Sequence, residues 1–246
     1  MREPRLSLLN AAAGGLPLPG PSVKLKPADG QPPRRADWWE GDPEALPLVS
    51  PDVAPSGILA IRKFLTPEQC ELIRDAFEAS RSKLASNEVD SFWDERVLWF
   101  DQIDDNAVAA KAVMQQARFV IGYKLAEHFA AGRLLYSDSQ QLVLWTQGQE
   151  MPVHVDNAHP DGSTHNTPHR DFAAVLYLND VFEGGEVFFP LQGLRLKPET
   201  GLLVGFRGSA DSPHGVTKVK SGERFTMPCW YSYDPAVAEG SMFTIF

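Results

Sequence analysis

The spacing of apolar residues changes close to residue 134. Upstream they recur at intervals of three and four, and downstream they form short runs separated by Gly, Pro, Asn and Asp. The first spacing is typical of one face of a helix, and the second of strands joined by turns. The pattern therefore predicts a helical region followed by a mainly β region.

Two helices are expected upstream. A strand-like run (Gly57–Leu65) precedes Thr66-Pro67-Glu68-Gln69. Thr66 can cap free amides and Gln69 can reach back to complete a capping box, so we expect a helix that continues to about Leu84. A second apolar periodicity predicts a helix from about residue 106 to 131, ended by Gly132.

The downstream region contains about eight or nine strand-like runs in roughly 100 residues. They are LLY, QLVLWT, PVHV, FAAVLYL, EVFFP, LRLKP, GLLVGFR, GVTKV and RFTMPCWYSY. This density predicts a mainly β fold with flanking helices (α+β) around a double-stranded β-helix core of the jelly-roll or cupin type. Such a core can hold a small-molecule site between its two sheets.

The first 48 residues differ from the rest. Eleven of the 20 prolines precede Ser56, and no periodicity is visible there. We interpret 1–48 as a Pro/Gly-rich extension and 49–246 as the domain, with helical support at about 66–131 and the jelly-roll core at about 134–235. Trp38 and Trp39 favour packing of its later part, more simply on the chain's own core than on a partner.

Composition narrows the function classes. With 23 Lys+Arg against 32 Asp+Glu, the charge of -9 disfavours a nucleic-acid partner. The two cysteines have no zinc-type spacing and fit a reducing, cytoplasmic location. No apolar run is long enough for a secretory signal or a membrane span, so we expect a soluble protein without a membrane partner. The oligomeric state is left open.

Metal-ligating residues occur at a suggestive spacing. His154 and Asp156 stand at i and i+2, and side chains so spaced on a strand share a face. His214 follows 58 residues after Asp156 (214 − 156). Two imidazoles and one carboxylate can form the facial triad that suits iron(II), whereas zinc usually prefers closed four-coordination. An isolated HxD is weak evidence, because it occurs more often as incidental polar residues on a surface strand.

Arg224 could supply an anion anchor. It lies ten residues after His214 (224 − 214), on a run whose alternation predicts a strand antiparallel to the one that begins at the histidine. A buried guanidinium needs an anion, and a carboxylate fits its geometry best. The alternative is an ordinary surface pair with a neighbour such as Glu223.

Four blocks in order resemble the catalytic core of prolyl-4-hydroxylase-type Fe(II)/2-oxoglutarate-dependent dioxygenases. They are LVLWTQGQEMPVHVDN, AAVLYLNDVFEGGEVFFP, GLLVGFRG and SPHGVTKVKSGERFTMPCWY, and the resemblance spans about Ser56 to Pro235. It implies iron ligation by His154, Asp156 and His214, with O2 and 2-oxoglutarate as co-substrates and ascorbate as an optional reductant. It also implies hydroxylation of an unactivated C–H bond, with succinate and CO2 as co-products.

The resemblance also implies residues that contact the oxoacid. Arg224 matches the anchor of its distal carboxylate, where many relatives have lysine. Tyr177 matches a tyrosine that bonds the same carboxylate in oxygen-sensing members, and Trp230 matches their tryptophan beside the site. Trp145 replaces a tyrosine of many relatives, which puts one polar contact in doubt. Core packing is an equally simple role for both tryptophans.

The substrate is less defined. Asn157, His169 and Arg170 lie near the expected mouth and are our candidate substrate contacts, although loop histidines are often merely solvated. Residues 91–102 contain four aromatics that suit either a lid or the core, and Glu183–Glu186 (EGGE) predicts a tight turn without chemistry.

Three functions are therefore considered. We expect a small-molecule or amino-acid substrate, held by a charged clamp such as Arg170 or Arg207. The first alternative is a peptidyl-prolyl hydroxylase acting on proteins. The second is a catalytically silent jelly-roll binding module, against which the complete triad and Arg224 argue.

Overall fold

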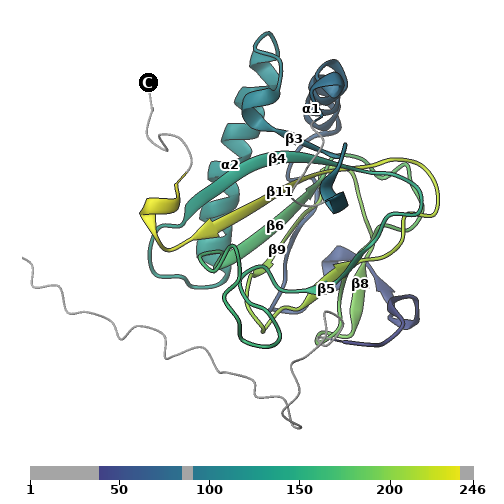
Figure 1. Ribbon diagram of the computed structural model, residues 1–246, viewed down its shortest axis with the longest axis vertical. Coiled ribbons are helices and arrows are strands. Elements are labelled where there is room, and N and C mark those ends of the chain that lie inside the picture. The colour runs from purple at the N-terminus through teal and green to yellow at the C-terminus, as the bar shows by residue number, and fades with distance from the viewer. Residues whose placement is uncertain (1–38, 85–90, 239–246) are drawn as a thin grey trace, which may run out of the picture.

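Two facing sheets form the centre of the molecule in the computed structural model, which describes residues 39–84 and 91–238 (Figure 1). The larger sheet has the strand order β2-β9-β6-β11-β4-β3, and the smaller has β1-β8-β7-β10-β5. The strands are β1 (Leu48–Val49), β2 (Leu59–Ile61), β3 (Val97–Trp99), β4 (Tyr136–Trp145), β5 (Met151–His154), β6 (Phe172–Tyr177), β7 (Val187–Phe189), β8 (Leu194–Leu196), β9 (Leu203–Arg207), β10 (His214–Val216) and β11 (Arg224–Ser232).

Two α-helices precede most of the strands, α1 (Pro67–Ala79) and α2 (Val108–His128). The predicted capping box is present: the Gln69 amide donates to Thr66 Oγ1 at 3.3 Å and the Thr66 amide to Gln69 Oε1 at 3.0 Å. Short 3-10 turns occupy Pro43–Ala45, Pro51–Val53, Arg81–Lys83, Ser91–Trp93, Phe100–Gln102 and Pro235–Val237. None of the helices in the described part of the chain is long and apolar enough to cross a membrane.

α1 ends earlier than the predicted residue 84. Its last helical residue is Ala79, and the buried Ser80 follows with a conformation outside the helical range. The Ser80 hydroxyl accepts a hydrogen bond from the Asp104 amide at 2.9 Å. Because this side chain secures the connection that leads to α2, the chain turns there instead of continuing the helix.

The helices cover the outer face of the larger sheet, and one hydrophobic core fills the space between them (Figure 1). It joins helical side chains such as Ile73 and Met114 to strand side chains such as Leu142 and Met227. A second core lies between the two sheets and includes Phe189 and Phe206. The inner face of the larger sheet is thus kept for the interior of the jelly roll, and the predicted fold class is confirmed.

Two details of the predicted strand arrangement are wrong. The runs LLY and QLVLWT do not form separate strands, because residues 136–145 make one long strand, β4. β11 is not the antiparallel neighbour of β10: β10 pairs with β5 and β7, whereas β11 pairs with β4 and β6 in the other sheet. The connection between them crosses from one sheet to the other, which local alternation cannot reveal.

The segment before β2 packs against the smaller sheet. Trp39 lies 5.7 Å from Phe188 between ring centroids, as expected of packing on the chain's own core, and Trp38 lies outside the described residues. The Arg195 side chain donates to the carbonyl oxygens of Leu46 (3.0 Å) and Glu44 (3.2 Å). The boundary predicted between residues 48 and 49 falls inside β1, which pairs in parallel with β8.

Candidate active site

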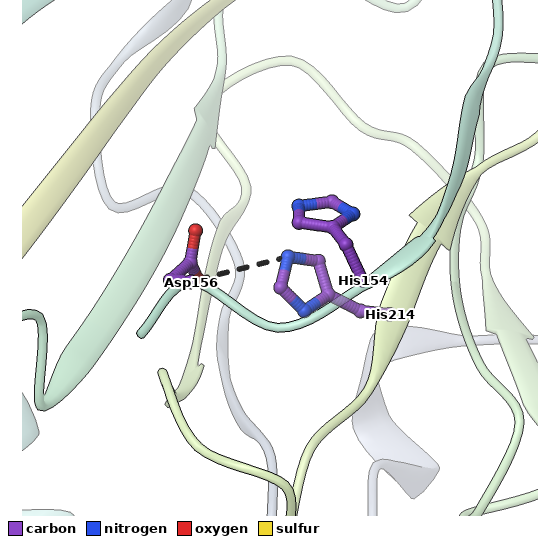
Figure 2. Close-up of side chains that lie close together, drawn as sticks. All are labelled: His154, Asp156 and His214. Atoms are coloured by element: carbon purple, nitrogen blue, oxygen red, sulfur yellow. Dashed lines mark ion pairs between the residues drawn. The ribbon is translucent and has the colours of Figure 1, made fainter. Parts of the chain in front are cut away.

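Three side chains converge in the interior, two from neighbouring strands of the smaller sheet and one from the segment that follows β5 (Figure 2). His154 ends β5, His214 begins β10, and the two residues are direct partners in the antiparallel pairing. Asp156 follows two residues after β5 ends. One possible ligand atom from each residue lies within 4.8 Å of the other two. The structure therefore brings together the ligands that the sequence predicted.

Backbone carbonyls fix the orientation of both imidazoles. His154 Nδ1 lies 2.9 Å from the Pro152 carbonyl oxygen, and His214 Nδ1 lies 3.0 Å from that of Ser212. Because a carbonyl only accepts, Nδ1 carries the proton in each ring and Nε2 presents a lone pair. This is the tautomer that a metal ion requires.

The Asp156 carboxylate divides its two oxygens between two tasks. Oδ1 accepts a hydrogen bond from Trp230 Nε1 at 3.0 Å, while Oδ2 is buried without a hydrogen-bond partner in the described structure. Oδ2 lies 3.8 Å from His214 Nε2. Leaving a buried acceptor unsatisfied costs about 1–3 kcal/mol, and more for a charged one. A cation bound between these atoms would remove that penalty, so the residues fit a divalent metal.

His214 is neutral around pH 7. Its burial, reinforced by the nearby His154, lowers the pKa of the His214 imidazole to about 4. Only a neutral imidazole can donate a lone pair to a metal.

Arg224 is buried, as the predicted anion anchor would be. It begins β11, is only 1% exposed, and makes no ion pair with any described residue. Its guanidinium carbon lies 5.3 Å from the Trp145 ring and 4.9 Å from the Tyr177 ring. The alternative pairing with Glu223 is wrong, because that carboxylate bonds to Arg81 at 3.0 Å. A buried guanidinium without a counterion fits an external carboxylate.

The aromatic neighbours of Arg224 also offer donors. The Tyr177 hydroxyl accepts from the Val187 amide at 3.1 Å, and its own hydrogen has no acceptor among the described residues. Trp145 Nε1 is also buried, and it has no hydrogen-bond partner among the described residues. The tryptophan that replaces tyrosine thus keeps a hydrogen-bond donor here, and its contact with the oxoacid stays a prediction.

The EGGE turn has a structural role that the sequence did not reveal. Gly185 has φ +66°, and a Cβ atom built there would lie 2.8 Å from Arg224 Cδ. Gly184 has φ +73°, and its Cβ would overlap the Lys218 carbonyl oxygen at 1.9 Å. The turn therefore makes the space in which the Arg224 side chain lies.

The candidate substrate contacts lie around the metal ligands. His169 Nε2 and Arg170 Nε both contact Asp138 Oδ2, at 3.1 and 3.0 Å. The backbone N–H of Asn157 donates to the carbonyl oxygen of Gly208 at 3.1 Å. Their contact with substrate stays a prediction. Asp138 was missed, because nothing in the run YSDSQ distinguishes it from an ordinary polar strand residue.

Two other predicted features have a clear position. Arg207 packs over the rings of Phe129 and Phe172, at 5.2 and 5.4 Å, which does not place it as a clamp on the metal site. In the segment 91–102, Phe92 and Trp93 each lie 6.0 Å from the Trp145 ring. These two aromatics therefore pack beside the pocket of Arg224.

Comparison with known proteins agrees with this geometry. A sequence model of the 2OG-Fe(II) oxygenase superfamily matches residues 140–232, a range that includes all three metal ligands and Arg224. This part of the chain is therefore similar to 2OG-Fe(II) oxygenases, and its curated relatives and solved neighbours include prolyl hydroxylases. Iron(II) and 2-oxoglutarate are the cofactor and co-substrate that this similarity indicates, and the residues of the site fit both.

Curated relatives are prolyl 3-hydroxylases. The chain is 33% identical to rat (Rattus norvegicus) prolyl 3-hydroxylase 2 over 100 residues, 36% of this chain and 14% of the relative. It is 38% identical to human (Homo sapiens) prolyl 3-hydroxylase 3 over 96 residues, 34% of this chain and 13% of the relative. It is 31% identical to human prolyl 3-hydroxylase 1 over 136 residues, which make up 47% of this chain and 18% of the relative. The chain thus spans less than a fifth of the length of these relatives.

Solved prolyl hydroxylases share the fold. A collagen prolyl hydroxylase from Paramecium Bursaria Chlorella virus-1 superposes with TM-score 0.52 and 21% identity, covering 74% of this chain and 97% of that one. A Pseudomonas putida prolyl-4-hydroxylase superposes with TM-score 0.53 and 21% identity, covering 77% of this chain and 96% of that one. A Trichoplax adhaerens prolyl hydroxylase bound to a hypoxia inducible factor peptide superposes with TM-score 0.58 and 15% identity, covering 75% of this chain and 88% of that one.

Proposed function

We propose that this protein hydroxylates a prolyl residue within a peptide, with iron(II), O2 and 2-oxoglutarate. The observation that carries the reaction class is the convergence of His154, Asp156 and His214 in the same interior as the unpaired, buried Arg224. A metal triad and a carboxylate anchor are the two parts that an oxoacid-dependent hydroxylase needs.

Peptide substrates are supported by the relatives. The curated ones are named prolyl 3-hydroxylases, and the Trichoplax adhaerens neighbour was solved with a peptide fragment. The sequence alone led us to expect a small molecule or free amino acid. The comparisons favour the peptide alternative, because none of these relatives is named for a free amino-acid substrate.

Each residue of the site would contribute a defined task. His154 and His214 would hold iron through Nε2 and Asp156 through Oδ2, while Arg224 would bind the distal carboxylate of 2-oxoglutarate. Bound iron with 2-oxoglutarate and O2 supplies the oxidising power for C–H hydroxylation. The carbonyls of Pro152 and Ser212 keep both imidazoles in the ligating tautomer.

The test is a mass-spectrometric assay with matched substrates. Proline-containing peptides and free L-proline are incubated separately with enzyme, iron(II), 2-oxoglutarate and ascorbate, and succinate is quantified alongside. We expect peptides to gain ~16 Da, one oxygen atom, with equimolar succinate. Because the relatives are named for 3- and 4-hydroxylation, the product is hydrolysed and the position of the hydroxyl on proline assigned by NMR.

The controls separate the competing functions. Asp156→Ala should abolish both products, since it removes a metal ligand. Oxidation of free proline without oxidation of any peptide would overturn the proposal in favour of the small-molecule function. Wild-type protein that binds neither metal nor 2-oxoglutarate would instead be a silent binding module.

A further inference from the structure

A line of contacts leads from the jelly-roll mouth to a metal ligand. Trp230 Nε1 donates to Asp156 Oδ1 at 3.0 Å. The Arg170 guanidinium carbon lies 3.8 Å from the centroid of the Trp230 ring. Arg170 Nε in turn donates to Asp138 Oδ2 at 3.0 Å. Asp138 and Asp156 are thus connected through two side chains in direct contact.

Asp138 is a well-fixed anchor for this line. Its carboxylate also accepts from the Ser139 amide at 2.6 Å and contacts His169 Nε2 at 3.1 Å. Burial on its own would raise the pKa of Asp138, but the Ser139 amide and the Arg170 guanidinium outweigh it and lower that pKa. The anchor is therefore a charged carboxylate at neutral pH.

The Arg170 guanidinium lies over the indole and is mostly removed from water. Its side chain is 17% exposed, and that of Asp138 is 18% exposed. A planar guanidinium that is partly removed from water and stacked on tryptophan gains both a cation–π attraction and close packing. Because Asp138 pins the guanidinium from the side, the indole plane is restrained as well.

We propose that Arg170 is a positioning residue for the metal ligand Asp156. Pinned by Asp138, Arg170 holds the Trp230 indole in place, and the indole N–H occupies Asp156 Oδ1 so that only Oδ2 faces the metal. Ligation through one oxygen leaves a coordination position free for the oxoacid and O2. The inference rests on the metal site of the proposed function but not on the identity of the substrate.

A substrate contact, which the sequence suggested for Arg170, is a different role. The two terminal amino groups of Arg170 make no hydrogen bond to the described residues, so they could also face a substrate. A positioning residue acts before substrate arrives, whereas a substrate contact does not. Metal affinity measured without substrate and without 2-oxoglutarate therefore separates the two roles.

The experiment titrates the metal-free protein with Mn(II) and follows free Mn(II) by EPR. We expect Trp230→Phe, which removes the donor to Asp156, to weaken Mn(II) binding about tenfold or more, as is usual for partners of metal ligands. Arg170→Met and Asp138→Asn act one and two contacts further out, and we expect a weakening of about three- to tenfold. The matched control is Arg133→Met, which removes an arginine stacked 4.0 Å over Tyr233 without contact to the metal ligands.

The double variant decides whether the residues act in series. If Arg170 acts through the indole, Arg170→Met combined with Trp230→Phe should bind Mn(II) no more weakly than Trp230→Phe alone. Additive losses would overturn the proposal. So would unchanged Mn(II) affinity in Arg170→Met, or an equal loss in Arg133→Met.

Two further comparisons protect the result. Thermal unfolding without metal shows whether each variant folds, and if Arg170→Met does not, Arg170→Lys and Asp138→Asn replace it with the same expected direction. Wild-type protein that does not bind Mn(II) would defeat the proposed function itself. Wild-type binding with unaffected variants would defeat only the positioning role.

Discussion

At the scale of single residues, the site depends on polar atoms whose partners the protein itself does not supply. Asp156 Oδ2 and Arg224 Nε are buried without hydrogen-bond partners in the described structure. In a protein interior such atoms are rare because each one destabilises the fold. Their opposite charges suit two different ligands, a cation at Asp156 and an anion at Arg224.

Replacing Arg224 should therefore separate binding from stability. We expect Arg224→Leu to weaken 2-oxoglutarate binding about 10–100-fold, because a charge-assisted pair contributes roughly 1.5–3 kcal/mol. Arg224→Lys should lose less, since it keeps the charge. Isothermal titration of Mn(II)-loaded protein with 2-oxoglutarate measures both.

The melting temperature of the metal-free Arg224→Leu protein should not fall, because the substitution removes an unpaired buried charge. Arg195→Leu is the matched control. Its guanidinium holds the segment around Glu44, so we expect lower stability and unchanged 2-oxoglutarate affinity. A large loss of stability in Arg224→Leu would mean that this arginine is structural.

At the scale of elements, turns and strand ends place the functional groups. Gly185, in the connection from β6 of the larger sheet to β7 of the smaller sheet, leaves room for the Arg224 side chain. The pairing of β5 with β10 sets His154 opposite His214. The pairing of these neighbouring strands, whose register shifts between His214 and Val216, therefore aligns two of the three metal ligands before any metal is bound.

Two glycines allow the function of the EGGE turn to be tested. Gly185 and Gly193 have nearly equal φ values, +66° and +67°, but only a Cβ at Gly185 would meet Arg224, since nothing lies within 4 Å at Gly193. Alanine at either position should destabilise the protein by about 1–2 kcal/mol through backbone strain, measured by urea unfolding.

Only Gly185→Ala should also weaken 2-oxoglutarate binding, because it displaces the guanidinium. If Gly193→Ala weakened that binding to the same degree, the effect would be one of general strain and not of the space around Arg224.

At the scale of the whole molecule, the helices seal one face of the larger sheet. Both cysteines lie in that layer, Cys70 on α1 and Cys229 on β11, and both are buried. Burial raises the pKa of the Cys70 thiol to about 11 and that of the Cys229 thiol to about 12. The reactive thiolate is therefore scarce at pH 8, and reagent access is blocked as well.

We accordingly expect the native protein to react very slowly with a thiol reagent such as Ellman's reagent at pH 8. Both thiols should become reactive together in denaturant, because either one is exposed only when the helices leave the sheet. Glutathione under the same conditions gives the rate of a free thiol. Fast reaction of one cysteine in native buffer would show that the helical layer opens locally.

Patterns within single segments accounted for much of this protein. The helix start at Thr66 and the existence of many short strands followed from capping chemistry and from apolar spacing. The predicted end of that helix failed at Ser80, whose hydroxyl serves the Asp104 amide, a partner 24 residues away. The pairing of β10 with β11 failed for a similar reason, since sheet membership depends on contacts across the whole fold.

The site divides in the same way. By itself the sequence predicted the fold, because strand periodicity is a local property, and the resemblance of its four ordered blocks to a known family singled out His154, Asp156, His214 and Arg224. Only the tertiary structure decided that Asp156 has one oxygen bound by Trp230, that Arg224 has no acidic partner among the described residues, and that Asp138 and Arg170 stand behind the indole. These facts depend on which distant segments come within hydrogen-bonding distance, and that is fixed only when the sheets and loops pack together.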